Sequence, residues 1–134
     1  MLAEWNNSFS VGISIIDNQH KTLFGLINKL NDGIQEHKSR EGLGEILKET
    51  IDYASEHFKT EEDLMREHRF PDLQRHKAEH DAMVEKLAGF RERYNRGETD
   101  FSVDLLMELI DWLHSHMGAT DSDLKPYMNA RGIF

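Results

Sequence analysis

Histidine and carboxylate side chains recur at helical spacing among the apolar residues of this sequence. His57 and Glu61 are four positions apart, and the same spacing separates His76 from His80. Residues four apart lie side by side on one face of a helix, so each pair projects in a common direction. Imidazole nitrogens and carboxylate oxygens bind transition metals such as iron, manganese and zinc. The pattern therefore indicates a metal centre.

Three further side chains complete the candidate ligand set. His20 and His116 lie on the apolar stripes of two other helical segments, and Asp121 follows His116 by five positions. Asp121 and His116 reach one centre only if the helix is distorted near Gly118, because five positions correspond to about 140° of rotation. A buried imidazole or carboxylate without a partner costs about 1–3 kcal/mol or more. A metal centre satisfies all of these groups together. The candidate metal ligands are His20, His57, Glu61, His76, His80, His116 and Asp121.

Five imidazoles and two carboxylates are more donors than one ion accepts, and they suit two ions. Suppose that Glu61 and Asp121 each bridge the metals and that an oxo or hydroxo group is added. One metal then becomes six-coordinate with three histidines, and the other becomes five-coordinate with two. The open position can take a small ligand such as a diatomic gas. Iron suits these donors better than calcium or magnesium, while zinc and manganese also accept them.

Four apolar stripes supply the helices that must position these ligands. They recur at three- and four-residue intervals and begin near Asp17, Leu43, Leu73 and Leu105. Asp17 is the expected N-cap of the first helix. Short connections over 37–42, 68–72 and 95–101 favour antiparallel neighbours. The sequence predicts an all-α protein, an antiparallel up-down-up-down four-helix bundle with an irregular N-terminal arm.

The chain length predicts a single domain over residues 1–134, since 134 residues suit one core. Residues 1–16 form the arm, 17–121 the bundle and 122–134 a C-terminal segment. Apolar residues of the arm are expected to pack across the bundle. They are Trp5, Phe9, Val11, Ile13 and Ile16.

Composition excludes several classes of function. The net charge of −9 repels phosphate backbones, which disfavours nucleic-acid binding. No apolar run approaches the roughly 20 residues that span a bilayer, and the N-terminus lacks the features of a signal peptide. The absence of cysteine excludes disulfides, thiolate metal sites and iron–sulfur clusters. We expect a cytoplasmic protein without membrane insertion.

Motifs spread over residues 5–121 resemble those of the hemerythrin family, and of its bacterial members in particular. The pairing of His-Phe-x-x-Glu-Glu with His-x-x-x-His is the most specific part of the resemblance. The matching segments are Trp5 followed by Ser10–Ile13, then Ile16–Lys21, His57–Glu62, His76–His80, and Trp112–His116 with Asp121.

The resemblance implies a non-haem di-iron site in a four-helix bundle that binds O2 reversibly. His76, His80 and His116 would hold the six-coordinate iron. His20 and His57 would hold the five-coordinate iron, with O2 bound end-on at its open position. Glu61 and Asp121 would bridge, together with an oxo or hydroxo group.

A few residues near the candidate ligands are interpreted as structural. His114 is expected to face solvent, and Glu62 to belong to a solvated face. His68 is expected to close the second helix, with an accessory role at the mouth of the site as the alternative. Phe70 stands where bacterial hemerythrins often carry tyrosine, and it is expected to lie away from the ligands.

Reversible O2 binding for carriage, storage or delivery is the leading hypothesis, and no enzyme activity is expected. No carboxylate or histidine is left over beside the metals as an obvious acid or base. This weighs against a hydrolase or a monooxygenase. One alternative is a sensor of O2, redox state or nitric oxide that signals to a protein partner. Another is an oxidase or peroxidase that uses the same di-iron centre. The expected state is a monomer, with O2 as ligand and a protein that receives O2 or a signal as a further partner.

Overall fold

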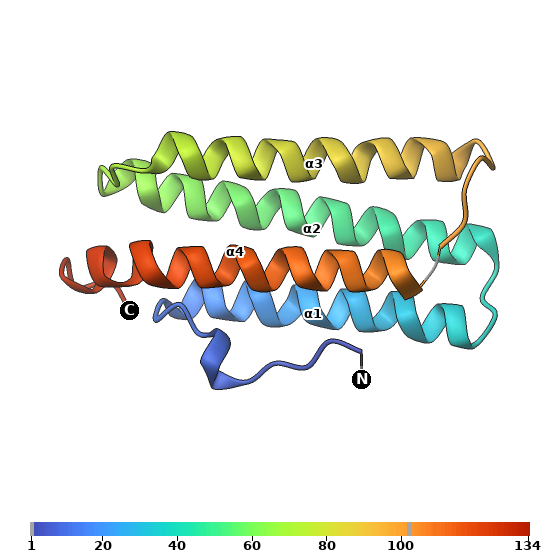
Figure 1. The fold of residues 1–134 in the computed structure, drawn as a ribbon, viewed down its shortest axis with the longest axis horizontal. Coiled ribbons are helices and arrows are strands. Elements are labelled where there is room, and N and C mark those ends of the chain that lie inside the picture. Colours follow the sequence, from blue (N-terminus) through green and yellow to red (C-terminus); the bar gives the residue numbers. More distant parts are fainter. Residues whose placement is uncertain (1, 102) are drawn as a thin grey trace.

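The computed structural model describes residues 2–101 and 103–134, with the side chains of 103, 104 and 119–122 outside that description. Within this part of the chain there are helices and no strand. Consecutive helices run in opposite directions, up-down-up-down (Figure 1), so the predicted all-α bundle is confirmed. The elements are the short 3₁₀-helix η1 (Asn7–Phe9) and the long helices α1 (Ser14–Gln35), α2 (Arg40–Glu67), α3 (Leu73–Asn95) and α4 (Val103–Asn129).

The N-terminal arm turns into α1 earlier than the sequence predicts. The helix begins at Ser14, and Asp17 lies in its first turn. The Asp17 carboxylate accepts hydrogen bonds from the Ser10 hydroxyl at 2.5 Å and from the Val11 N–H at 2.8 Å. Its prediction as the N-cap is therefore wrong, because the side chain holds the arm instead of the helix end. Gly12 makes the turn at a φ of 71°, which suits a residue without Cβ.

Helix α4 also differs from the prediction. It continues through Gly118 as far as Asn129, so most of the segment expected after residue 121 is helical. The chain is helical throughout from His116 to Asp121, so the unwinding considered near Gly118 is wrong. Asp121 lies in this helix, and its side chain falls outside the described residues.

The helices end in similar hydrogen-bonded turns with a residue in the left-handed conformation. After α3 this residue is Gly97, with φ 76°, and its N–H donates to the Tyr94 carbonyl. His37 follows α1 and Arg69 follows α2 in the same way, each with φ 55°. A side chain with a Cβ is strained in this conformation, whereas glycine is not.

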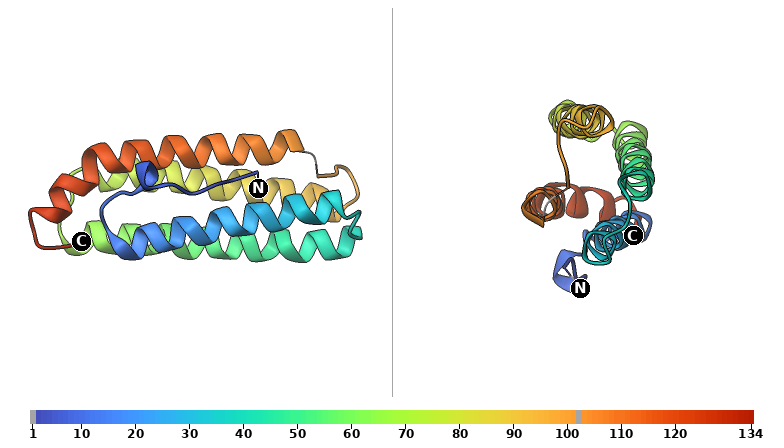
Figure 2. Two further views of the ribbon diagram at one scale, coloured as in Figure 1. Left: turned by 90° about the horizontal axis from the view of Figure 1, so that it is seen from below. Right: turned by 90° about the vertical axis from the view of Figure 1, so that its right-hand side faces the viewer.

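Two apolar clusters hold the bundle together. The larger one lies between the four helices, and arm residues Trp5 and Phe9 pack against it. The arm runs beside α1 (Figure 2), where the Asn28 side chain pairs with the Ala3 backbone through two hydrogen bonds of 2.7 Å. This confirms that the arm packs across the bundle. The smaller cluster consists of Val11, Ile13, Ile16, Met65, Phe70, Leu124 and Met128.

No helix in the described part of the chain is both long and apolar enough to cross a membrane.

Candidate metal centre

One buried carboxylate, that of Glu61, contacts imidazoles from all four long helices. Glu61 on α2 has no solvent exposure. Its Oε1 atom lies 3.0 Å from His57 Nε2 and 3.5 Å from His20 Nε2. Its Oε2 atom lies 3.0 Å from His80 Nε2 and 3.1 Å from His116 Nε2. The two oxygens thus face two different groups of histidines, although His116 Nε2 also lies 3.3 Å from Oε1.

The imidazole rings are grouped in the same way. The His20 and His57 rings lie 4.6 Å apart, and the His80 and His116 rings lie 5.0 Å apart. Ligand atoms of His20, His57, Glu61 and His116 all lie within 4.8 Å of one another. This spacing is compatible with shared metal ions, because metal–ligand bonds of about 2 Å put the ligands of one ion a few ångströms apart.

His76 lies next to this group. It is 1% exposed, and its ring is 6.4 Å from that of His80. The structure therefore brings together five of the seven candidate ligands, namely Glu61 and the four histidines that contact it. A sixth, His76, lies next to them. Asp121 cannot be added to this geometry, since its side chain is outside the described residues.

Phe70 lies against His76, with the two ring centres 5.6 Å apart. The expectation that this departure from the family pattern lies away from the ligands is wrong. The turn after α2 buries Phe70 in the smaller apolar cluster, where it is 6% exposed.

The buried nitrogens fit a metal centre. Among the described residues, neither ring nitrogen of His76 has a hydrogen-bond partner, and neither does Nδ1 of His20. Buried polar atoms are normally satisfied, and each exception in a native fold requires an explanation. Metal ions accept the free lone pairs of neutral imidazoles, so the donor set that these residues offer fits such a centre.

Burial and charge shift the pKa values of these groups in different directions. Burial lowers the pKa of His20 and that of His76. Burial also acts to raise the pKa of Glu61, but the surrounding imidazoles outweigh it and hold that pKa well below its usual value. For His80 burial is again outweighed, because Glu61 and Glu62 accept hydrogen bonds from its ring and raise its pKa. Without metal, the imidazoles thus keep the Glu61 side chain in its ionised carboxylate form.

Two residues that the sequence analysis did not assign to the site contact the candidate ligands from outside. Gln19 Oε1 lies 2.7 Å from His57 Nδ1, and Glu62 Oε2 lies 3.0 Å from His80 Nδ1. Glu62 had been assigned to a solvated face, and this is wrong, because its side chain is only 14% exposed. The carboxylate directly after Glu61 was a signal that could have identified Glu62. No spacing rule identifies Gln19, since its contact joins α1 to α2.

The remaining histidines lie outside the cluster. His68 caps α2 at its C-terminal end, which confirms that it closes this helix. His114 is half-buried, and its ring stacks on that of Phe9 at 4.5 Å. Its expected solvent-facing position is wrong, because the N-terminal arm covers it.

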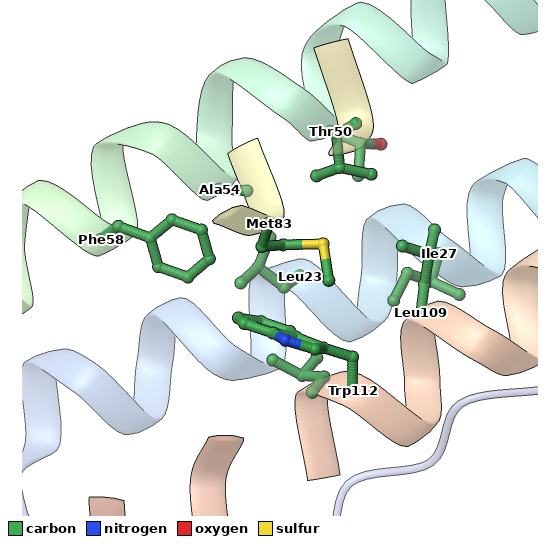
Figure 3. A pocket seen from close by; sticks show the side chains of 10 residues that line it. Leu23, Ile27, Thr50, Ala54, Phe58, Met83, Leu109 and Trp112 are labelled. Carbon is green, nitrogen blue, oxygen red and sulfur yellow. The ribbon is translucent and has the colours of Figure 1, made fainter. Parts of the chain in front are cut away.

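Figure 3 shows the residues that line an apolar cavity of about 40 Å³. Two of its walls connect it to the histidine cluster. Phe58 lines the cavity and stacks on the His80 ring at 4.3 Å, and Trp112 lines it and stacks on the His116 ring at 5.0 Å. The Thr50 hydroxyl donates to a carbonyl of its own helix, so it does not offer its proton to the cavity. An apolar lining of this kind disfavours bound water and suits small apolar molecules. The lining residues are Leu23, Ile27, Thr50, Ala54, Phe58, Met83, Leu87, Leu109, Trp112 and Leu113.

Comparisons with known proteins agree with this geometry. The family model of the hemerythrin HHE cation binding domain matches residues 11–128. A bacteriohemerythrin of Methylococcus capsulatus (strain ATCC 33009 / NCIMB 11132 / Bath) is 34% identical over 122 residues, which cover 91% of this chain and 92% of that protein. A hemerythrin-like protein of Naegleria gruberi is 32% identical over 121 residues, covering 90% and 89%. A crystal structure of wild-type hemerythrin matches with a TM-score of 0.86 at 34% identity, covering 95% of each chain.

A buried carboxylate among imidazoles, held by four antiparallel helices, defines a helical-bundle metalloprotein. The match of the domain model over most of the sequence, together with relatives above 30% identity, shows which one. The chain belongs to the hemerythrin family. The buried histidine and glutamate cluster in such a domain suits a non-haem di-iron site.

Proposed function

We propose that this protein binds O2 reversibly at a non-haem di-iron centre. His76, His80 and His116 would hold one iron, and His20 and His57 would hold the other. Glu61 and Asp121 would each serve as a ligand to both ions, together with an oxo or hydroxo group. The function is carriage, storage or delivery of O2 and not catalysis. Two iron ions in this setting supply the electron transfer that lets O2 bind and leave unchanged.

The division of the Glu61 carboxylate carries this proposal. One oxygen is closest to His57 and the other to His80, which the proposal assigns to different irons. A bridging carboxylate must present its oxygens to two metals in this manner. With the histidines divided between the irons as the family resemblance implies, this geometry supports Glu61 as the bridge.

The protein's own side chains also favour an apolar gas as the ligand. The described residues around Glu61 are imidazoles and apolar groups, and the adjacent cavity is walled by apolar side chains. Phe58 and Trp112 separate the cavity from two of the proposed ligands by stacking on their rings. Such apolar walls disfavour bound water beside the centre and accept a small neutral molecule.

The test is the iron content and visible absorption of the purified protein, reduced without air and then exposed to it. We expect two irons per chain, no colour when reduced, and a charge-transfer band that appears with O2 and disappears on its removal. Direct passage to a stable oxidised form favours the sensor alternative, and turnover of a reductant favours an oxidase or peroxidase. One zinc, or no iron, contradicts the proposal.

Two variants test the ligand assignment in the same assay. His57→Ala is expected to lose iron or the oxygenated spectrum. His37→Ala is the matched control, because His37 is an exposed histidine in the turn after α1. An unchanged oxygenated spectrum in His57→Ala contradicts the assignment of this residue.

The cellular setting is proposed on the same basis. We propose one domain over residues 1–134, monomeric and cytoplasmic, without membrane insertion or nucleic-acid binding. A protein partner receives O2 or a signal from it. Gel filtration across a range of protein concentrations tests the monomer, since a self-associating chain elutes earlier as its concentration rises.

A further inference from the structure

The Gln19 side chain is fixed in one orientation by a chain of hydrogen bonds. The Thr60 hydroxyl donates its only proton to the Glu56 carbonyl at 3.1 Å. Thr60 Oγ1 can therefore only accept from Gln19 Nε2, which lies 3.2 Å away. This places the amide oxygen of Gln19, and not its NH2 group, against the ring of His57.

The orientation of Gln19 determines where His57 carries a proton. Gln19 Oε1 is an acceptor and lies 2.7 Å from His57 Nδ1, so this nitrogen is the N–H donor. In a neutral imidazole the other nitrogen is then free to bind a metal. That nitrogen, Nε2, is the atom that faces Glu61 at 3.0 Å. Gln19 thus holds the His57 ring in the Nδ1-protonated tautomer, which leaves Nε2 free to bind a metal.

His80 is held by the same type of contact, but its partner carries a charge. Glu62 Oε2 lies 3.0 Å from His80 Nδ1, while Nε2 faces Glu61. Phe58 stacks on the His80 ring at 4.3 Å and an interplanar angle of 8°, which leaves the ring little freedom to rotate. Glu62 lies at a groove between α2 and α3 and is 14% exposed. One proposed ligand is therefore supported by a neutral amide and another by a carboxylate.

We infer that Gln19 and Glu62 are positioning residues that make the two metal positions electrically unequal. The inference rests on the proposed function, because it assigns His57 and His80 to different metals. A carboxylate hydrogen-bonded to a metal-bound imidazole makes that ligand more basic and stabilises the more positively charged metal ion. A neutral amide orients the ring with little of this effect. The position at His80 accordingly favours the oxidised ion more strongly than the position at His57.

Two isosteric substitutions exchange the neutral partner of one ring and the charged partner of the other. Gln19→Glu gives His57 a charged partner, and Glu62→Gln gives His80 a neutral one. In iron-loaded protein we expect the reduction potential to fall in Gln19→Glu and to rise in Glu62→Gln. A merely structural role would move both potentials in the same direction, so the opposite signs identify the electrostatic effect.

The same variants can be measured without iron, in protein loaded with Zn²⁺ and examined by ¹H–¹⁵N NMR of the histidine rings. In the unsubstituted protein we expect a proton on Nδ1 of both His57 and His80. A stronger, charge-assisted hydrogen bond moves that proton resonance to higher frequency. Gln19→Glu is expected to move the His57 signal upwards, and Glu62→Gln to move the His80 signal downwards. Each change is expected to leave the other ring unaffected.

Substitutions at neighbouring exposed positions provide matched controls. Asn18→Asp adds the same charge to α1 as Gln19→Glu, and Asp63→Asn removes the same charge from α2 as Glu62→Gln. Both controls are expected to leave the potential and the ring signals unchanged.

A variant without any acceptor measures the positioning effect alone. Gln19→Leu is expected to weaken Zn²⁺ binding by about 10- to 100-fold, the usual range for loss of such a partner. Competition with a chelator of known affinity measures the change. Potentials that shift equally in both charge variants, or only as far as in the controls, overturn the inference. If the unsubstituted protein fails to take up two metal ions, the proposed function fails instead.

Discussion

Two adjacent layers of the bundle obtain their stability from different sources. The ligand layer surrounds Glu61, and the cavity layer surrounds the 40 Å³ cavity beside it. Both are built from the same helices on the same inward-facing stripes. On α3, for example, His80 belongs to the first layer and Met83, three positions later, to the second. A single helix therefore changes from a buried histidine of the candidate metal site to apolar core within one turn.

The difference shows that a stripe of inward-facing positions does not by itself define a hydrophobic core. The cavity layer is stabilised by burial of apolar surface and is complete without metal. The ligand layer holds imidazole nitrogens that no described residue satisfies, such as those of His76. Separate perturbations of each layer should therefore have separable effects on folding and on metal binding.

The largest effect is expected from a truncation in the cavity layer. Leu23 is 5% exposed and lines the cavity, so Leu23→Ala enlarges a space that is already present. We expect a loss of about 2–5 kcal/mol in the free energy of unfolding, as for other buried leucines. Urea unfolding measures it, and iron analysis should still find the metal content of the unsubstituted protein. A parallel loss of iron would show that the two layers are not independent.

Removal of metal should affect the ligand layer alone. Metal that binds only the folded state adds about 2.7 kcal/mol when its free concentration is 100 times the Kd. We therefore expect the protein with metal to unfold at higher urea concentration than the metal-free protein. The difference should persist in Leu23→Ala and disappear in Glu61→Gln. Equal stability of the metal-free and metal-loaded forms would contradict a shared central site.

Acid should destabilise the metal-free protein through the ligand layer. Burial holds the pKa values of His20 and His76 below the ordinary 6.5. Between those lowered values and 6.5 the unfolded chain binds more protons than the folded one, so stability decreases as pH falls through this window. His80 has a raised pKa, and its contribution is present below 6.5 and lost as pH rises through its folded-state value.

Glu61 adds a second acid-sensitive contribution. Its pKa lies well below the ordinary 4.5, so the stability that it supplies is present above 4.5 and lost as pH falls further. Urea midpoints of the metal-free protein at a series of pH values measure both effects. Leu23→Ala should show the same pH dependence as the unsubstituted protein, because the cavity layer contributes no titrating group. A midpoint that stays level or increases below pH 6.5 would contradict the expected direction.

The smallest effect is expected outside both layers, at the end of α1. His37 has a φ of 55°, which strains a residue with a Cβ. His37→Gly should raise the free energy of unfolding by roughly 0.5–1 kcal/mol, since the relief of strain exceeds the added freedom of the unfolded chain. Metal content and the pH dependence should not change. Gly25, an interior position of α1, is already glycine and offers no comparison. The contrasting control is therefore Ser39→Gly at the N-cap of α2, which should destabilise the protein slightly.

Most of the fold could be predicted because helical periodicity is a local property of the sequence. The stripes that contain His57 and His80 identify α2 and α3 with ends close to those observed. Glu61 and its imidazole neighbours were recognisable because polar residues on an apolar stripe must be satisfied. The errors arose where tertiary contacts determine the outcome. Asp17 has the chemistry of an N-cap, but it binds the arm instead.

The outer parts of the site were harder to predict for the same reason. Gln19 and Glu62 lie at the flanks of their helices, where polar residues usually face solvent. Their roles depend on which neighbouring helix covers that flank, and spacing along one helix does not determine this. His114 faces away from the ligands as the spacing indicates, but the arm covers it because Phe9 folds back onto α4. The contact between Phe70 and His76 likewise depends on the turn after α2.

The central position of Glu61 has a consequence for how the protein matures. The carboxylate contacts histidines from α1, α3 and α4 as well as from its own helix, so it braces the bundle before any metal arrives. These contacts would let the chain fold first and bind the proposed metal ions afterwards. If the proposed function holds, metal uptake would be an exchange of partners within a formed interior, and we expect its rate to follow how often the helices part. Slow loading would be a property of native-state breathing and not of chain folding.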